Sequence, residues 1–277
     1  MNKEIEDKLL SFYKEDAGNG DITTEALIDD KIVSARIEAR EDLVLAGVEE
    51  CVWLFNYFGV KAESKISDGC TAHKFDKIIS LNGSVRAILS LERTCLNLLG
   101  RMSGIATETS RCVELVKVIN SHVKVSATRK TAPGLKFFDK KAVVLGGGLS
   151  HRYDLSDAFL IKDTHRTFMS VSDAVKKCRA FSDKKVECEV ESVADAVSAA
   201  KAGADIVMFD NMSVDKIREA IEALVKEGLR EKVSLELSGG IRPDDFQKYA
   251  GLDIDTVSMG YLTHSVRCAD VSLEIDV

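Results

Sequence analysis

The segment Val186-Glu187-Cys188-Glu189-Val190-Glu191, followed by Ser192–Ala202 and then by Ile206-Val207-Met208-Phe209-Asp210, decides the fold. The two outer stretches are short apolar runs that end in acidic residues, and the stretch between them has the length and apolar spacing of a helix. A strand, a helix and a second strand in this order form a parallel pair, because the helix carries the chain back to the starting edge of the sheet. The segment therefore predicts an α/β fold built on a parallel sheet.

The same alternation extends from about residue 122 to the last quarter of the chain. Four further apolar runs end in polar residues or glycine: Val123–Arg129, Phe159–Lys162, Val233–Ser238 and Thr256–Gly260. Helical patterns fill several of the gaps, for example Val214–Glu227. Six such strands in succession predict a barrel or partial barrel rather than a small open sheet.

The residues before about 110 have a different pattern. Val33–Arg40 alternates apolar and polar side chains and predicts a half-buried strand. Ile78–Leu89 predicts two strands that meet at an Asn82-Gly83 turn. A long helix follows from about Ser90 to Asn120, and Ser103-Gly104 is expected to kink or thin it. We place the boundary between two domains in this helix.

Composition narrows the class of protein. A net charge of -7 argues against a broad nucleic-acid surface, and no apolar run is long enough to span a bilayer. The acidic start of the chain lacks the features of a signal peptide, and none of the seven cysteines forms a CxxC pair. We therefore expect a cytoplasmic protein with reduced cysteines that binds neither nucleic acid nor membrane.

Cationic side chains gather near the ends of the first two strands of the predicted barrel. They are Arg129, Lys130, His151, Arg152 and Lys162. Barrel enzymes place their chemistry at the carboxyl ends of the strands. Arginine and lysine there bind carboxylate and phosphate through charge-assisted hydrogen bonds, so the cluster predicts a site for a small polyanion. The alternative is a set of solvated surface cations.

Acidic residues follow on the next two strands. Glu187, Glu189 and Glu191 alternate and share one face of their strand, and Asp210 ends the strand after it. If that face points into the barrel, unpaired carboxylates are costly, and a divalent cation such as Mg2+ would relieve them. If the face points to solvent, the three glutamates are only a solvated edge.

Glycines close the last two strands. Ser238-Gly239-Gly240 and Gly260 let backbone N–H groups approach a phosphate, and the last two strands of such barrels commonly supply a phosphate site. His264 lies four residues after Gly260 and could donate to the same phosphate, or could be structural. A Gly-Gly pair alone also occurs in tight turns.

In combination these motifs resemble the quinolinate phosphoribosyltransferase family, also called nicotinate-nucleotide pyrophosphorylase (carboxylating). The resemblance runs nearly end to end. The motifs that carry it are Gly20-Asp21-Ile22-Thr23-Thr24, Glu92-Arg93-Thr94, Ser103–Thr107, Thr128–Gly134, Gly146–Arg152, Leu160–Asp163, Ser238–Ile241 and Gly260–Ser265.

The resemblance implies an N-terminal α/β sandwich domain followed by an incomplete α/β barrel, and a protein that is at least a dimer. We assign 1–110 to the first domain and 111–265 to the barrel, and expect 266–277 to return to the first domain. The implied reaction joins quinolinate to phosphoribosyl pyrophosphate with Mg2+. Its products are nicotinate mononucleotide, pyrophosphate and CO2, a step of NAD biosynthesis.

The resemblance also implies roles for individual residues. Arg129, Lys130, His151, Arg152 and Lys162 would surround the two quinolinate carboxylates, and Arg93 would reach the same site from the neighbouring subunit. Glu189 and Asp210 would hold Mg2+. Ser238, Gly239, Gly260 and His264 would hold the 5'-phosphate. Lys130, Lys162, Glu189 and Asp210 are the residues that we expect to be catalytic.

Two positions depart from the family pattern, which usually has Thr at Ala132 and Asn at Thr164. His165–Phe168 also resembles a paralogue encoded beside molybdate transporters. That paralogue lacks the counterparts of Lys162 and Arg93, and both are present here, which favours quinolinate as the substrate. A further alternative is a non-catalytic barrel that binds a phosphorylated ligand, but such a barrel has little need for the acidic pair.

Overall fold

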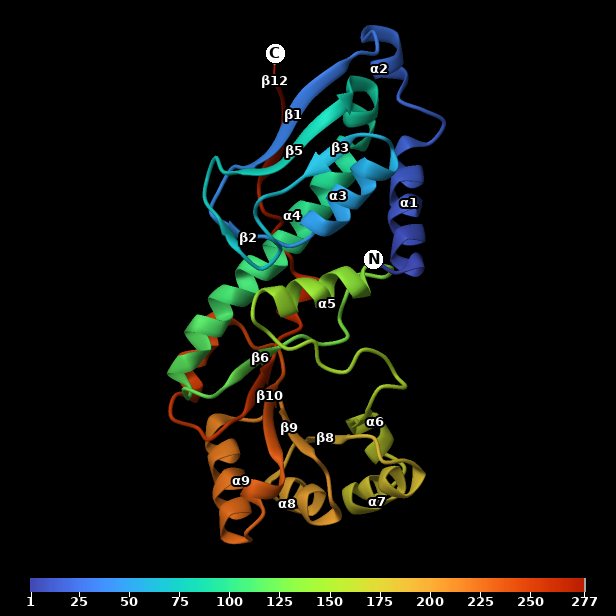
Figure 1. The fold of residues 1–277 in the computed structure, drawn as a ribbon. Helices are drawn as coiled ribbons and strands as arrows, with labels where there is room; N and C mark the ends of the chain where they lie inside the picture. The colour runs from blue at the N-terminus through green and yellow to red at the C-terminus, as the bar shows by residue number, and fades with distance from the viewer. Residues whose placement is uncertain (277) are drawn as a thin grey trace. The chain divides into compact units, whose positions relative to one another are not determined.

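The computed structural model describes residues 1–276, which form two compact units. Unit 1 contains Met1–Glu108, Phe137–Gly146 and the segment that begins at Val266. Unit 2 contains Thr109–Lys136 and Gly147–Ser265. Figure 1 shows the elements of each unit.

Unit 2 is built on a six-stranded parallel sheet with the order β6-β11-β10-β9-β8-β7. The strands are β6 (Lys124–Ser126), β7 (Phe159–Ile161), β8 (Val186–Val190), β9 (Ile206–Asp210), β10 (Ser234–Ser238) and β11 (Thr256–Ser258). All five pairings between neighbours are parallel, and β6 and β7 lie at the two ends of the order. The predicted α/β class, with an incomplete barrel of parallel strands, is confirmed.

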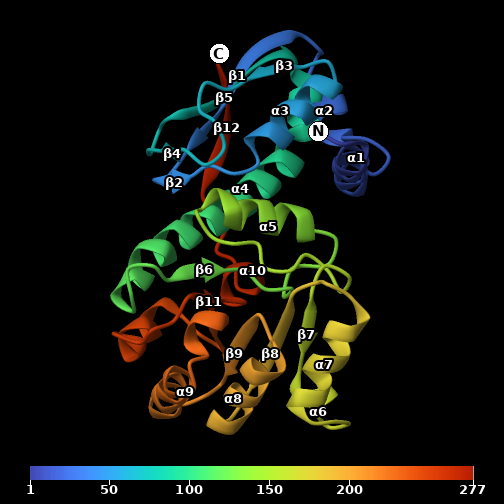
Figure 2. The same ribbon diagram turned by 60° about the horizontal axis from the view of Figure 1, so that its bottom comes forward.

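Helices cover the outer side of this sheet. They are α7 (Val171–Phe181), α8 (Val193–Ala202) and α9 (Val214–Lys226), and Figure 2 shows them beside β8 and β9. Ser192 caps the start of α8 by accepting a hydrogen bond from the Asp195 backbone N–H, and Gly203 ends the helix in the left-handed conformation. The shorter helices are α6 (Asp163–Arg166), α10 (Tyr261–His264), η1 (Val116–Val118), η2 (Arg230–Lys232) and η3 (Pro243–Tyr249).

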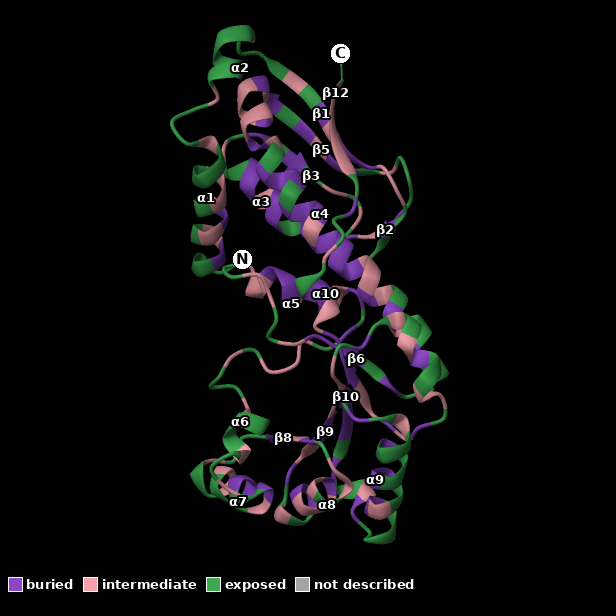
Figure 3. Cartoon of the chain, turned by 180° about the vertical axis from the view of Figure 1, so that it is seen from behind, coloured by how far each residue is buried: buried purple, intermediate pink, exposed green. Residues whose placement is uncertain are grey.

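Unit 1 contains a four-stranded antiparallel sheet with the order β12-β1-β5-β3. Its strands are β1 (Ile32–Ala39), β3 (Lys61–Glu63), β5 (Lys77–Ser84) and β12 (Val271–Asp276), and β2 (Leu43–Val44) pairs with β4 (Thr71–Ala72). The helices are α1 (Lys3–Ala17), α2 (Ile22–Leu27), α3 (Val48–Tyr57), α5 (Lys136–Leu145) and most of α4 (Val85–Leu115). Buried residues line α3 and α4, as Figure 3 shows.

The predicted turn at Asn82-Gly83 is wrong, because both residues lie inside β5. Asn82 pairs with Ser34 of β1, and Gly83 pairs with Val33. A Cβ atom on Gly83 would lie 2.9 Å from the Cα atom of Val60. The glycine therefore serves a close approach of two backbones rather than a turn, and α4 begins directly after the strand.

Gly104 in α4 also allows a close approach of two backbones. The sequence predicted that Ser103-Gly104 would kink or thin the helix at this point. The helix continues through Gly104, and a Cβ atom there would lie 2.1 Å from the backbone oxygen of Arg267. The backbone N–H of Ala269 donates to the carbonyl of Gly100, one turn earlier. The C-terminal segment thus packs directly on the helix before it forms β12.

Contacts place most of α5 in unit 1, although the expected boundaries left it in 111–265. Asp139 of α5 is fully buried and accepts two hydrogen bonds from the guanidinium of Arg101 on α4, at 2.8 and 2.9 Å. Phe138 packs against Phe12 of α1 with 5.6 Å between ring centroids. These contacts join residues far apart in sequence, so the local pattern of the helix could not reveal them.

Replacement of Gly104 by alanine tests the close approach. In an exposed helix the change would stabilise the protein by about 1 kcal/mol. Here the added methyl group meets backbone that cannot rotate away, so we expect a loss of about 1–3 kcal/mol in the free energy of unfolding. Urea unfolding measures the change, with Asn97→Ala at an exposed position of the same helix as the control. A Gly104→Ala protein as stable as the parent would contradict the packing.

Candidate active site

A pocket of about 330 Å3 opens at the carboxyl ends of the strands of unit 2. Residues from every strand or strand end line it: Thr128, Arg129, Lys130, His151, Arg152, Leu160, Lys162, Asp163, Glu189, Met208, Asp210, Asn211, Ser238, Gly239, Gly240 and Ser258. The structure thus brings together the predicted cations, the predicted carboxylates, and Ser238 and Gly239. Because the strands are parallel, side chains far apart in sequence meet at this single edge.

The cations of the pocket come from three segments. Arg129 and Lys130 follow β6, and the Lys130 carbonyl accepts a 2.8 Å hydrogen bond from the Thr263 hydroxyl. Arg152 donates to the Ala158 carbonyl at 3.2 Å. Burial, and then the positive charge of Arg129, lower the pKa of Arg152. Two guanidinium groups that repel each other in a partly buried pocket favour an anionic ligand.

Lys162 pairs with Glu189 across the pocket. The Lys162 Nζ atom lies 3.2 Å from Glu189 Oε1. Burial raises the pKa of Glu189, the ion pair with Lys162 lowers it, and the charge of Asp210 raises it again. The site that the sequence divided into basic and acidic halves therefore contains one direct contact between them.

The three alternating glutamates of β8 have different surroundings. Glu187 is buried, Glu189 lines the pocket, and Glu191 lies beyond the end of the strand with its side chain 60% exposed. Val186, Cys188 and Val190, on the opposite face, are buried. The face that carries Glu187 and Glu189 thus points into the barrel. Of the two alternatives that the sequence left open, an interior face is correct for these two glutamates, and a solvent-exposed edge is correct for Glu191.

Asn211 lies directly after Asp210 at a predicted strand end, where the sequence assigned it no role, and it shapes the acidic side of the pocket. Its φ angle of 52° is left-handed, which asparagine tolerates better than most residues. The side-chain amide donates to Asp210 Oδ2 at 3.1 Å. A Cβ atom on Gly239 would lie 2.4 Å from Asn211 Oδ1, and Gly239 itself has a φ of +102°. Only glycine fits there, so Asn211 and Gly239 depend on each other.

Gly260 and His264 lie beside the lining residues rather than among them. A Cβ atom on Gly260 would come within 2.8 Å of the Lys130 side chain and 3.1 Å of the His264 ring. The His264 ring also contacts the Ser265 hydroxyl at 2.7 Å. The missing Cβ atom therefore lets Lys130 and His264 approach the same short turn.

Arg93, the remaining predicted residue, is exposed on the part of α4 that belongs to unit 1. It is not among the residues that line the pocket of unit 2. The expectation that Arg93 serves the site of a neighbouring subunit stays a prediction.

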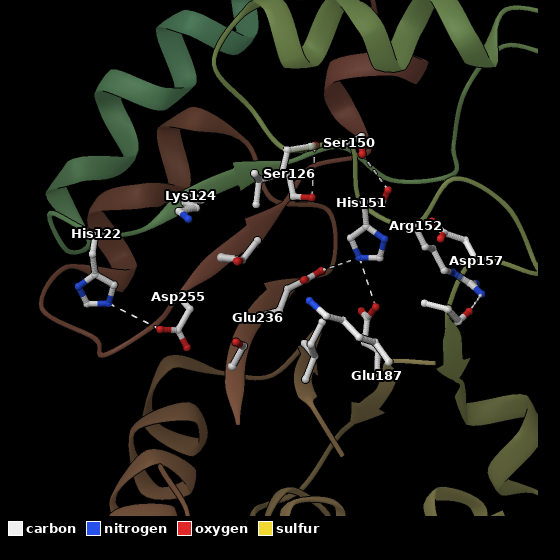
Figure 4. Close-up of a pocket in the computed structure, with 16 residues that line it drawn as sticks. His122, Lys124, Ser126, Ser150, His151, Arg152, Asp157, Glu187, Glu236 and Asp255 are labelled. Carbon is white, nitrogen blue, oxygen red and sulfur yellow. Dashed lines mark hydrogen bonds and ion pairs between the residues drawn. The ribbon is translucent and has the colours of Figure 1, made fainter. Parts of the chain in front are cut away.

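A second, larger cavity of about 790 Å3 lies at the opposite, amino-terminal ends of the strands of unit 2. Figure 4 shows its lining, with His122, Lys124 and Asp255 at one side and Glu187 and Glu236 below His151. His151 and Arg152 line both cavities. The smaller pocket is the candidate active site, because the cations, carboxylates and glycines of the strand ends converge there.

Glu236 was missed by the sequence analysis. It is 3% exposed on β10, and its carboxylate lies 3.3 Å from the Nε2 atom of His151. The only sequence signal was a single glutamate between two leucines of an apolar strand. Thr128, Met208 and Ser258 were also not predicted; each belongs to an apolar strand or directly follows one.

No helix among the described residues has the length and apolar character to cross a membrane.

Comparison with known proteins identifies the family to which both domains are similar. Residues 21–103 match the N-terminal domain of quinolinate phosphoribosyl transferase, and residues 105–274 match its C-terminal domain.

Curated relatives match over nearly the whole chain. A probable nicotinate-nucleotide pyrophosphorylase [carboxylating] of Methanothermobacter thermautotrophicus is 44% identical and covers 97% of this chain and 98% of the relative. The protein of that name in Bacillus subtilis is 35% identical over 97% of this chain and 92% of the relative.

Solved structures agree with this match. The nicotinate-nucleotide pyrophosphorylase of Ehrlichia chaffeensis is similar with a TM-score of 0.92 at 31% identity, and each chain is covered completely. Together with the cations, carboxylates and glycines of the pocket, these matches identify the family. The chain belongs to the quinolinate phosphoribosyl transferase family.

Proposed function

We propose that this chain transfers the phosphoribosyl group of phosphoribosyl pyrophosphate to quinolinate and releases pyrophosphate and CO2, with nicotinate mononucleotide as the product for NAD biosynthesis. One observation carries the proposal. In a chain of this family, a single pocket holds four arginine and lysine side chains beside three carboxylates, among them those of Glu189 and Asp210. Relatives that match it over their whole length carry the name of this activity.

The cations fit a ligand with two neighbouring carboxylates, as quinolinate has. Arg129, Lys130, Arg152 and Lys162 supply forked and point-like donors from three segments. Binding a dianion would remove the repulsion that helps to lower the pKa of Arg152. It would also give Lys162 an alternative partner to Glu189. The pocket therefore gains more from a dicarboxylate than from a monocarboxylate.

Glu189 and Asp210 fit Mg2+. Carboxylate oxygens are the ligands that Mg2+ prefers, and it usually takes one or two of them together with phosphate oxygens and water. Burial and the neighbouring charge of Asp210 both oppose ionisation of Glu189, so a divalent cation between them would be favourable. When bound, Mg2+ would neutralise the charge that develops on the departing pyrophosphate.

Ser238, Gly239, Gly260 and His264 fit the 5'-phosphate. Ser238 ends β10 and Gly239 follows it, both in the pocket, while Gly260 and His264 follow β11, the strand beside β10. Glycines at these two strand ends leave room for phosphate oxygens next to backbone N–H groups.

The reaction needs no protein nucleophile. The pyridine nitrogen of quinolinate attacks the anomeric carbon of the ribose as the bond from that carbon to the pyrophosphate oxygen breaks. The pyridinium ring then accepts the electron pair that the departing CO2 leaves at the adjacent ring carbon, which afterwards takes a proton. The chain's residues hold the two substrates in reacting geometry, which is where such sites gain most of their rate.

Arg93 would complete the pocket of a partner subunit in a homodimer or a higher homo-oligomer. It is exposed on α4 and lies outside unit 2, and the family resemblance assigns it to the neighbouring site. A two-fold axis would generate two such shared sites. We also propose that the protein is cytoplasmic and has neither nucleic acid nor membrane as a partner. The net charge of -7 supports the absence of a nucleic-acid surface.

The first prediction concerns the substrate. Purified protein should convert quinolinate and phosphoribosyl pyrophosphate to nicotinate mononucleotide only with Mg2+, and kcat/KM for nicotinate should be lower by about tenfold or more. A missing carboxylate leaves a buried cation unpaired, which costs about 1–3 kcal/mol. Chromatography of the nucleotide and release of labelled CO2 measure both reactions, with chelator as the control. Equal turnover of nicotinate, or no turnover of quinolinate, would favour the paralogue or the non-catalytic barrel.

The second prediction separates the two sides of the pocket. Lys162→Ala should lose about 1.5–3 kcal/mol of quinolinate binding free energy, because a charge-assisted hydrogen bond is removed. Asp210→Ala should weaken Mg2+-dependent use of phosphoribosyl pyrophosphate and leave quinolinate binding measurable by calorimetry. Lys216→Ala, at an exposed position of α9, is the matched control for loss of a lysine. If both site variants lost quinolinate binding and neither changed the Mg2+-dependent use of phosphoribosyl pyrophosphate, the division of the pocket into a quinolinate side and a metal side would be refuted.

The third prediction concerns the shared site. Arg93→Ala and Lys162→Ala should each be nearly inactive alone. A mixed dimer carries one site with both defects and one intact site, so with random pairing roughly a quarter of the wild-type sites should return. Activity of co-expressed, doubly tagged protein measures this. If mixed dimers form and activity stays at the level of the single variants, Arg93 does not act across an interface.

A further inference from the structure

His151 is held in an unusual backbone conformation inside unit 2. The loop that carries it is paired with β6, since Leu149 donates to the Val125 carbonyl and accepts from the Ala127 backbone N–H, both at 2.8 Å. Two residues later His151 has a φ of 56°, in the left-handed region that residues other than glycine adopt infrequently, although asparagine, aspartate and histidine do so more often than the rest. The backbone is therefore strained at this residue, and strained residues are often found at functional sites.

Two buried carboxylates hold the imidazole ring. The Nε2 atom lies 3.4 Å from Glu187 Oε2 and 3.3 Å from Glu236 Oε1. Glu187 comes from β8 and Glu236 from β10, and both are 3% exposed. Figure 4 shows that the two contacts leave from the same ring nitrogen. The two strands are separated by β9, so the ring bridges the interior of the sheet.

The surroundings of the ring favour its positively charged form. Burial by itself would lower the pKa of His151, but the hydrogen bonds and charges of Glu187 and Glu236 outweigh burial and raise it to about 10. Arg152 is the next residue in the chain. The other charged groups around the cavity below the ring are His122, Lys124, Asp157, Lys185 and Asp255. Among the described residues, Glu187 and Glu236 are the charged groups within 4 Å of the ring nitrogens, and they raise its pKa.

The ring's second nitrogen is not used by the protein. Among the described residues, His151 Nδ1 is buried and has no hydrogen-bond partner. An imidazolium donates from both nitrogens, so the Nδ1–H group of a charged His151 is left with an unmet hydrogen bond. His151 also lines the pocket of Lys162 and Glu189. A carboxylate of a substrate bound in that pocket would satisfy this donor.

We propose that Glu187 and Glu236 are positioning residues of the active site: they keep His151 charged and fix its ring at the floor of the pocket, so that Nδ1–H is reserved for a carboxylate of the substrate. The inference rests on the proposed function, because it takes quinolinate as the ligand. It adds two residues that contact no substrate themselves. Their effect is to make the affinity for a dicarboxylate independent of pH where a free histidine would titrate.

Two other roles for the cluster make different predictions. His151, Glu187 and Glu236 have the spacing of metal ligands, but a metal would have to replace the proton that the two carboxylates stabilise. A purely structural role would stabilise the fold and leave substrate affinity unchanged at every pH.

Nuclear magnetic resonance of the whole protein decides whether His151 is charged. With 15N-labelled histidine, both ring nitrogens of His151 should keep the chemical shifts of an imidazolium from pH 6 to pH 9. In the Glu187→Gln/Glu236→Gln protein, burial remains while the carboxylates are gone, so the ring should be neutral through most of this range. A ring in the wild-type protein that titrates near pH 6.5, or that binds added Zn2+ stoichiometrically, would overturn the proposal. This measurement on the wild type stands even if the double variant fails to fold.

Quinolinate binding by calorimetry tests the role in the site. The wild-type affinity should change little from pH 6 to pH 9, whereas that of the double variant should be weaker by about tenfold or more at pH 8, where the charge is lost. The single variant Glu236→Gln, which keeps one contact, should fall between them. Glu222→Gln, at an exposed position of α9, is the control for the same change of charge. Equal quinolinate affinity in the double variant and the wild type at pH 8 would refute the positioning role.

The two proposals fail in different ways. If the protein binds no quinolinate while His151 stays an imidazolium, the proposed function is wrong and the assignment of charge survives. If quinolinate binds and His151 is neutral, the proposed function stands and the positioning role is lost.

Discussion

A charge inside unit 2 is stable only beside an opposite charge, and this requirement organises the interior of the barrel. An isolated buried ion costs several kcal/mol, whereas a paired one recovers much of that cost. The ring of His151 meets two glutamates in the deepest layer, and Lys162 meets Glu189 one layer nearer the opening. Arg152 and Arg129 are both positively charged and repel each other, and an anionic substrate bound between the two sides of the pocket would relieve this repulsion.

The layers follow from the geometry of parallel strands. Residues two apart on β8 point to the same side, so Glu187 and Glu189 form successive steps along one interior face. The first step is closed by the protein's own histidine. The second step lines the open pocket, and its ion pair with Lys162 is the one that the proposed substrate and Mg2+ would replace. The same strand thus contributes one fixed charge and one exchangeable charge.

Much of this arrangement could be predicted from the sequence. Buried parallel strands are apolar runs that end in polar residues, which is why the six strands and the basic, acidic and glycine-rich strand ends were identified. The turn predicted at Asn82-Gly83 was wrong because the glycine is needed for close packing against Val60, a residue distant in sequence. Glu236 was not predicted as a site residue because its partner, His151, lies 85 residues away and leaves no signal in the sequence around Glu236. The position of a residue along a strand can be predicted from the neighbouring sequence, whereas the residue that pairs with a buried charge is determined by the three-dimensional fold.

The edge strand β12 has a consequence for synthesis of the protein on the ribosome. It pairs with β1, yet the whole of unit 2 lies between them in the chain. The backbone groups along one side of β1 therefore stay unpaired until β12 emerges, which happens only after all of unit 2 has been synthesised. An open strand edge is a template for pairing with other chains. The nascent protein thus passes through a stage at which a chaperone that covers strand edges would find its target on β1.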